Sequence, residues 1–159
     1  MTETANARRR WRVAFVSATV AWALTLPIAA FAASGPGESS FTHMAAAVPY
    51  AIGAVVCHQL PARSFALWSR QLPVCARCTG IYAGAALAAL CASAVLTKWR
   101  GAFSSARTLL MVAALPTFAT LVYEWSAAVP PNAVRAIAGV PLGAAVALII
   151  LAALDDQVN

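Results

Sequence analysis

Charge is scarce in this sequence. Only 10% of its 159 residues are charged, and acidic side chains number 5 against 11 lysines and arginines. A water-soluble domain has roughly a quarter of its residues charged. Here 62% of the residues are hydrophobic, and the mean hydropathy is +0.76. This composition excludes an ordinary soluble domain and predicts an integral membrane protein.

The sequence also lacks the motifs of several common enzyme classes. Nothing in it resembles a phosphate-binding glycine loop, a serine triad or a paired-carboxylate active site. The basic residues that give the net charge of +6 lie at the ends of apolar runs, not on a face interleaved with aromatic residues. We therefore expect the lipid bilayer as a partner and no nucleic acid. No reaction follows from these observations.

Five apolar segments approach the length that crosses a bilayer, which is about 20 residues. They are residues 13–33, 41–56, 79–97, 108–128 and 136–154. We predict an all-α, polytopic helical membrane bundle of about five transmembrane helices. Segment 41–56 is short and contains Pro49, so the alternative is four spans plus one peripheral or re-entrant helix.

The basic residues are compatible with both topologies. Five spans place eight lysines and arginines inside and three outside, whereas four spans place seven inside and four outside. Both distributions obey the positive-inside rule, the first slightly better. In either case two crossings separate residues 57–78 from residues 129–135, so these two segments share one membrane face.

We expect one integral membrane domain over residues 1–159, in the bacterial cytoplasmic (inner) membrane and multi-pass. Residues 1–12 form a basic cytoplasmic tail, because four arginines precede the first apolar run. Residues 13–33 are the first span or an uncleaved signal anchor, since the run is longer than the usual apolar region of a signal peptide.

Most of the reactive side chains lie in one Cys/His loop, residues 57–78, with the sequence CHQLPARSFALWSRQLPVCARC. Cys75 and Cys78 are spaced for one metal ion or a redox dithiol at the start of a helix. A helical hairpin would return Cys57, and with it His58, to this pair. Cys57, His58, Cys75 and Cys78 are therefore the predicted metal ligands, and zinc is the predicted ion. His58 is the weakest of the four, because adjacent side chains diverge.

Two alternatives remain open for these thiols. The first is a membrane thiol–disulfide oxidoreductase, because a helix N-terminus and Arg77 both lower a cysteine pKa. The second is a non-enzymatic membrane scaffold. The membrane face on which the loop lies discriminates between metal binding and disulfide exchange. A cytoplasmic loop stays reduced and favours metal, whereas an external loop permits disulfides. Cys91 is about 20 Å deeper along the helix and is expected to be a small core residue.

Polar residues near the thiols form a second group of candidates. Arg63 and Ser64 are expected to bind an anionic lipid or small molecule, or to reach the headgroups. Glu124 lies in an apolar span and should have a partner. Arg135 is the nearest candidate, and Arg63 and Arg77, on the same membrane face, are alternatives. The full set of candidate anion-binding or supporting residues is Gln59, Arg63, Ser64, Arg77, Glu124, Asn132 and Arg135.

Small residues recur at helical spacing in two spans. Gly80 and Gly84 share a stripe in one of them, and Gly139 and Gly143 share a stripe in the other. Such stripes let helices approach closely.

Three motifs resemble one known family. They are CHQ at residues 57–59, PARSF at 61–65 and LPVCARCTGIYAG at 72–84, with PPNAVRAIAG at 130–139 as a weaker fourth. The chain resembles the small prokaryotic membrane proteins catalogued as domain of unknown function 2085. The resemblance implies a membrane location and a cysteine and histidine signature, and it implies no activity.

Overall fold

The computed structural model describes residues 2–35, 40–99, 105–126 and 129–156, although some side chains within these ranges are not described. Its helices are α1 (Thr2–Ala32), α2 (Ser40–Val56), α3 (Ala76–Trp99), α4 (Ala106–Trp125) and α5 (Asn132–Asp156). The prediction of an all-α membrane bundle is confirmed. The thiol loop, residues 57–78, adds a short 3-10 helix η1 (Pro61–Arg63) and a hairpin of β1 (Ala66–Leu67) and β2 (Arg70–Gln71), which were not predicted.

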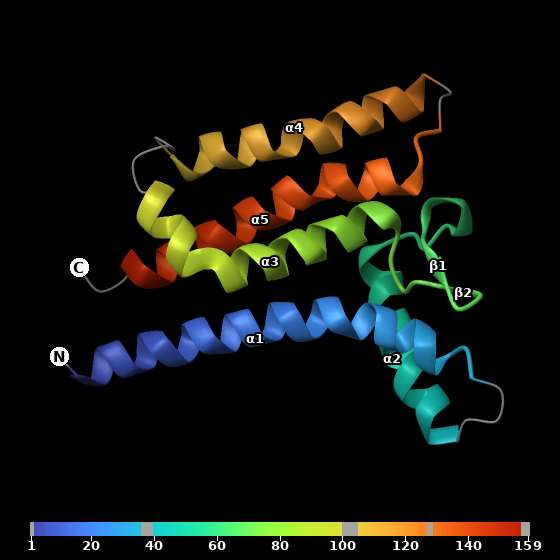
Figure 1. Cartoon of the computed structure of the whole chain (residues 1–159), viewed down its shortest axis with the longest axis horizontal. Helices are drawn as coiled ribbons and strands as arrows, with labels where there is room; N and C mark the ends of the chain where they lie inside the picture. Colours follow the sequence, from blue (N-terminus) through green and yellow to red (C-terminus); the bar gives the residue numbers. More distant parts are fainter. Residues whose placement is uncertain (1, 36–39, 100–104, 127–128, 157–159) are drawn as a thin grey trace.

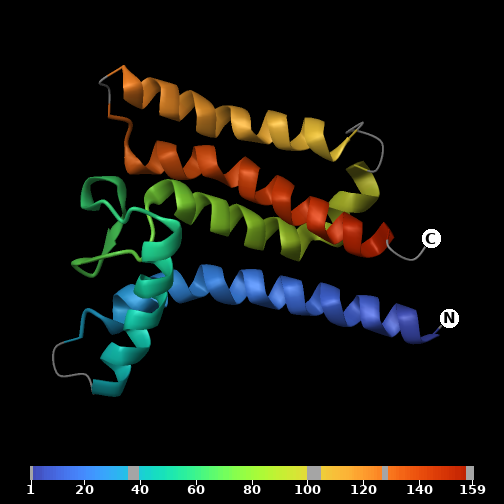
Figure 2. The same ribbon diagram turned by 180° about the vertical axis from the view of Figure 1, so that it is seen from behind.

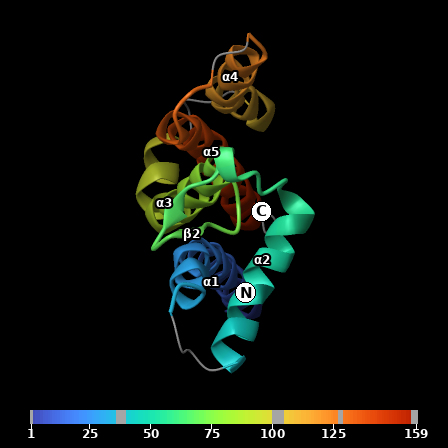
Figure 3. The same cartoon turned by 90° about the vertical axis from the view of Figure 1, so that its right-hand side faces the viewer.

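Four long helices lie side by side along the long axis of the molecule, in the order α1, α3, α5, α4 (Figure 1). Seen from the end, they form a single stack (Figure 3). Both termini lie at one end, which we call the terminal end, and the β-hairpin lies at the other, which we call the site end (Figure 2). The outer surface of α4 exposes large apolar side chains such as Leu115 and Phe118. We expect this surface to contact lipid.

Helix α2 does not run with the other four, but crosses the end of α1 steeply (Figures 1 and 3). Its residues Met44, Val48, Ile52 and Val55 are exposed, and they follow the helical period on one side. Among the described residues, α1, α4 and α5 are long and apolar enough to cross a membrane, and the 24 residues of α3 lie alongside them. This arrangement favours four spans plus one peripheral helix over five spans.

The glycine stripes allow α3 and α5 to pack backbone against backbone. A Cβ atom on Gly80 would fall on the carbonyl oxygen of Ala136, and one on Gly143 would fall on that of Ile81. The predicted close approach is therefore confirmed. Because both helices begin at the site end, this interface fixes the depth of one N-terminus relative to the other.

Candidate functional site

Hydrogen bonds from its own amide side chains hold the thiol loop together. Gln59 has a positive φ of 47°, which turns the chain sharply after α2. Its Nε2 donates hydrogen bonds to the carbonyl oxygens of Tyr50, at 2.8 Å, and Pro73, at 2.6 Å. Gly53 leaves the space for this contact, since a Cβ atom there would collide with the Pro73 carbonyl. The end of α2 is thereby fixed beside the segment that leads into α3.

A second amide side chain, that of Gln71 on β2, makes hydrogen bonds across the loop. Gln71 donates from Nε2 to the carbonyl oxygen of Gln59, at 2.6 Å, and to Oγ of Ser64, at 3.2 Å. Ser64 Oγ in turn donates to the carbonyl oxygen of Leu60, at 3.0 Å. Asn132, from α5, donates to the Ser64 carbonyl at 3.0 Å. The hydroxyl group of Ser64 is thus engaged within the loop, and Asn132 joins the loop to α5.

The hairpin is anchored through its turn. Trp68 and Ser69 have φ values of 50° and 60°, the positive values that a tight two-residue hairpin turn requires. The Trp68 ring meets Phe31 of α1 edge to face, with 5.2 Å between centroids. The thiol loop is therefore braced on α1, as well as on α2 and α5.

These contacts bring three sulfur atoms together. The Sγ atoms of Cys57, Cys75 and Cys78 all lie within 4.8 Å of one another, and all three residues are free thiols. The backbone N–H of Cys75 donates to Cys57 Sγ at 3.2 Å. Hydrogen bonding with the Cys78 thiol lowers the pKa of the Cys75 thiol to about 5. The lowered pKa favours the thiolate of Cys75, the form that binds metals and attacks disulfides.

The sulfur geometry fits a tetrahedral metal ion. Zinc–sulfur bonds of about 2.3 Å place ligand sulfurs roughly 3.8 Å apart, and the three Sγ atoms here lie within 4.8 Å of one another. His58 lies next to the group, exposed and outside the set of three. Cys91 is exposed on α3, so its assignment to the core was wrong: its side chain lies on the outer surface of the helix, where lipid would cover it. The side chain of His43 lies outside the described part of the chain.

Beside the thiols, one carboxylate binds three arginines. Glu124 Oε1 accepts from Arg77 Nη2 at 2.8 Å and from Arg135 Nε at 2.9 Å. Its Oε2 lies 3.5 Å from Nη1 of Arg63. The side chains of Glu124 and Arg135 are only 6% and 4% exposed. The expected pair with Arg135 is confirmed, and so is the expectation that residues 57–78 and 129–135 share one face.

The arginines have further partners that keep them in place. Arg77 Nη2 donates to Oγ1 of Thr120 at 3.2 Å. Arg135 Nη1 donates to Oδ1 of Asn132 at 2.8 Å and to the carbonyl oxygen of Ala62 at 3.5 Å. We call Arg63, Arg77 and Arg135, gathered around Glu124, the arginine cluster. It ties together α3, α4, α5 and the thiol loop.

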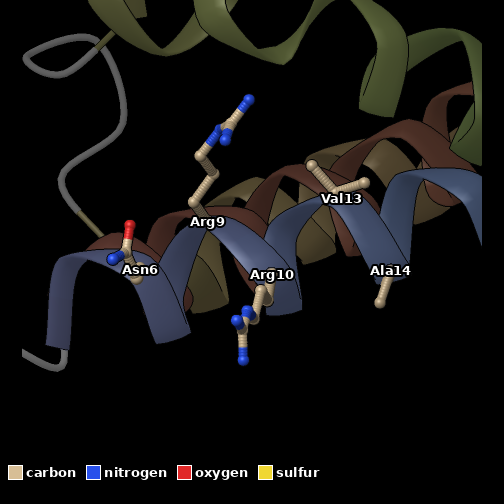
Figure 4. Close-up of a pocket in the computed structure, with 5 residues that line it drawn as sticks. All are labelled: Asn6, Arg9, Arg10, Val13 and Ala14. Atoms are coloured by element: carbon tan, nitrogen blue, oxygen red, sulfur yellow. The ribbon is translucent and has the colours of Figure 1, made fainter. Parts of the chain in front are cut away.

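The thiols and the arginine cluster border one cavity of about 240 Å³. It is lined by Cys57, His58, Gln59, Leu60, Arg63, Cys75, Arg77 and Arg135. Seven of these eight belong to the predicted candidate set. A larger hollow of about 530 Å³ lies along the start of α1. All its lining residues come from that one helix, and its two arginines, Arg9 and Arg10, point in different directions (Figure 4). Of these two cavities, the first alone gathers polar groups from several elements.

Sequence reasoning missed three supporting residues. Tyr50 donates from its hydroxyl to the Gln71 carbonyl, Gln71 bridges the two sides of the loop, and Thr120 accepts from Arg77. A polar residue in an otherwise apolar helix is the signal that marks Tyr50 and Thr120. Gln71 carried no such signal, because its role depends on the hairpin.

Comparison with known proteins gives a family and no activity. The family model described as "Predicted membrane protein (DUF2085)" matches residues 57–149. The uncharacterized protein MJ1492 of Methanocaldococcus jannaschii is 51% identical over 35 residues, which cover 22% of this chain and 22% of that protein. An uncharacterized protein of Methanothermobacter thermautotrophicus is 40% identical over 63 residues, which cover 40% of this chain and 54% of that protein.

These relatives are matched over only part of their length. The chain spans 22% of the first and 54% of the second. No solved structure matches the chain. The family model covers the thiol loop, α3, α4 and most of α5, so the chain belongs to the membrane protein family DUF2085.

Proposed function

We propose that this membrane protein holds a metal ion on Cys57, Cys75 and Cys78, and that the ion is zinc. The observation that carries the proposal is the group of three Sγ atoms within 4.8 Å of one another. A dithiol that exchanges disulfides needs two sulfurs, whereas a third sulfur within reach of both is typical of a metal site. Thiolates are soft ligands that favour zinc over the hard divalent ions magnesium and calcium.

His58 is the fourth ligand that we propose. It is exposed and lines the same cavity as Cys57 and Cys75, and a set of three cysteines and one histidine is common in structural zinc sites. The sharp turn at Gln59, where φ is 47°, gives the backbone the non-helical course that lets adjacent residues bind one ion. The ion would clamp the end of α2 to the start of α3.

Elemental analysis of the detergent-purified protein tests this proposal. We expect about one zinc per chain in the parent protein, a loss of most of it in Cys57→Ser, Cys75→Ser and Cys78→Ser, and a partial loss in His58→Ala. Cys91→Ser is the matched control and should keep its zinc, because Cys91 is not part of the sulfur group. A parent protein free of metal, or a Cys75→Ser protein that retains as much as the control, would refute the site.

Thiol–disulfide exchange is a second candidate, favoured by the position of the thiols. They lie at the end opposite the basic start of α1 (Figure 1). If the basic end is cytoplasmic, the thiols lie at the outer face of the membrane, where disulfides persist. We infer a cytoplasmic-membrane location and this orientation from the same charges.

The redox step would transfer two electrons from the protein to a substrate disulfide. The Cys75 thiolate attacks one substrate sulfur, which breaks the substrate S–S bond and releases the other sulfur as a thiolate. The Cys78 thiolate then attacks Cys75 Sγ, which releases the second substrate thiolate and leaves a Cys75–Cys78 disulfide. Cys57 serves as the alternative resolving thiol.

Counting thiols separates the two functions. Protein purified without reductant and denatured in an alkylating reagent has four reactive thiols if the site holds metal. It has two if the site is an oxidised dithiol, and reduction then restores four. A metal-bound parent protein with four thiols would eliminate the redox candidate.

A further inference from the structure

The cavity beside the thiols holds more positive charge than its surroundings compensate. Three guanidinium groups, of Arg63, Arg77 and Arg135, gather on the single carboxylate of Glu124, so two of the three positive charges have no carboxylate of their own among the described residues. A Cys75 thiolate, or a zinc ion on three thiolates, would add one negative charge, so one positive charge in excess would remain with or without metal. We propose that this cavity binds a phosphate group, either of a lipid headgroup or of free phosphate.

Burial makes this excess costly. The side chains of Arg135 and Arg77 are 4% and 16% exposed, and charges withdrawn from water are destabilising unless they are paired and hydrogen-bonded. Among the described residues, Glu124 is the only carboxylate paired with this cluster, and all three arginines share it. An anion in the cavity would supply the missing negative charge. A purely structural ion pair would need no such anion, because one arginine would balance one carboxylate.

Donors remain for such an anion. Each guanidinium group has five N–H donors, and Glu124 takes one nitrogen from each arginine. Nε of Arg77 is buried and has no hydrogen-bond partner among the described residues. All three arginines line the cavity, and the described protein groups leave at least one of their donors, Nε of Arg77, unsatisfied.

The N-termini of α3 and α5 beside the cavity also favour an anion there. Helices α3 and α5 both begin at this end, and Cys75, which precedes α3, and Arg135, in the first turn of α5, both line the cavity. Helix N-termini carry partial positive charge and bind phosphate.

Size and shape select the chemical class. The cavity, of about 240 Å³, is smaller than the usual pocket for a drug-sized ligand, which is roughly 300 to 1,000 Å³. It accommodates one small anionic group with a few waters, at about 30 Å³ per water. Arginines from η1, α3 and α5 approach from three elements, which matches a tetrahedral oxyanion with several acceptor oxygens better than a planar carboxylate.

A matched pair of arginine variants tests the proposal. Arg63→Gln removes a cavity arginine whose side chain is 50% exposed and whose link to Glu124 is the longest, at 3.5 Å, so the fold should survive. Arg70→Gln is the control, because Arg70 is exposed on the neighbouring β2 and does not line the cavity. Both variants carry the same loss of charge in the same loop.

Binding is measured in two arms on the detergent-purified full chain. The first is equilibrium dialysis against radiolabelled inorganic phosphate at constant ionic strength. The second is native mass spectrometry with phosphatidylglycerol, with diacylglycerol as the matched lipid without phosphate. We expect binding in at least one arm, weakened about tenfold or more in Arg63→Gln, since this variant loses a charge-assisted hydrogen bond to the anion, and unchanged in Arg70→Gln.

The pattern of binding identifies the source of the phosphate. Binding of inorganic phosphate alone assigns a free anion, and binding of phosphatidylglycerol without diacylglycerol assigns a headgroup. Absence of binding in both arms, or equal affinities of Arg63→Gln and Arg70→Gln, would overturn the proposal. Zinc content measured on the same samples is independent of the outcome, because Arg63 contributes no metal ligand, so a failure here is distinct from a failure of the metal site.

Discussion

The two ends of the molecule use arginine in different ways. At the terminal end, Arg8, Arg9, Arg10 and Arg12 come from one helix, and among the described residues only Arg12 pairs with an acidic group, Asp155, at 3.3 Å. At the site end, the arginine cluster comes from three elements and converges on one buried carboxylate. Charges spread along one helix can orient a protein in a membrane. Charges brought together from distant segments build a site.

The largest expected effect concerns which end faces the cytoplasm. Ser69→Cys places a reporter at the exposed hairpin turn of the site end, and Ala7→Cys places one at the terminal end. If the terminal end is cytoplasmic, a membrane-impermeant maleimide should label Ser69→Cys in intact cells and Ala7→Cys only after lysis. The parent protein gives the background from native thiols. The reverse pattern would place the thiols in a reducing compartment and remove the support for disulfide exchange.

The next effect tests whether the convergence at the site end matters for stability. Glu124→Gln leaves three clustered arginines without their carboxylate. Removing one partner of a buried ion pair costs about 3 to 5 kcal/mol, so the free energy of unfolding in detergent should fall by that order. Thermal unfolding of the purified variant, at a fixed phosphate concentration, measures it. Equal stability of variant and parent would show that the cluster does not depend on Glu124.

Sequence alone predicted the helices and the meeting of the two polar segments. Long apolar runs fix the spans, and the number of crossings between residues 57–78 and 129–135 fixes their common face. The spacing of Cys75 and Cys78, with Cys57 at the end of the preceding helix, was enough to predict one group of sulfurs. These results follow from chain connectivity and bilayer thickness, which local sequence records well.

The orientation of α2 and the sharing of Glu124 were not predictable in the same way. Helix α2 is apolar, so hydropathy does not distinguish a short span from a helix that crosses α1. Its position depends on bonds from Gln59 and Tyr50 to segments far along the chain. Similarly, the sequence favoured Arg135 for Glu124 and offered Arg63 and Arg77 as alternatives. Only the packed loop shows that all three bind the same carboxylate at once. The lysine and arginine at 98 and 100, used in the charge count, have side chains outside the described part of the chain.

A smaller effect is expected where the site end depends on helix packing. Gly80→Ala adds one methyl group against the Ala136 carbonyl of α5. Overpacking of this kind costs about 1 to 3 kcal/mol, and the resulting shift of α3 would also move Cys75 and Cys78. We therefore expect lower thermal stability together with weaker zinc retention against a chelator. Leu87→Ala, at an exposed position of the same helix, should change neither, and equal effects of the two changes would argue against the packing explanation.

The smallest effect is expected at the terminal end. The side chains of Arg12 and Asp155 are 32% and 19% exposed, so Asp155→Asn removes a pair that water and salt partly screen. Partly exposed pairs contribute about 0 to 1 kcal/mol, and high salt should reduce even that difference. Thermal unfolding at low and high salt, alongside Glu124→Gln, compares the two ends directly. Asp155→Asn would lower the free energy of unfolding as much as Glu124→Gln only if burial of the carboxylate contributed little. Equal losses would therefore mean that the convergence of arginines from separate elements does not make the site end more stable than the terminal end.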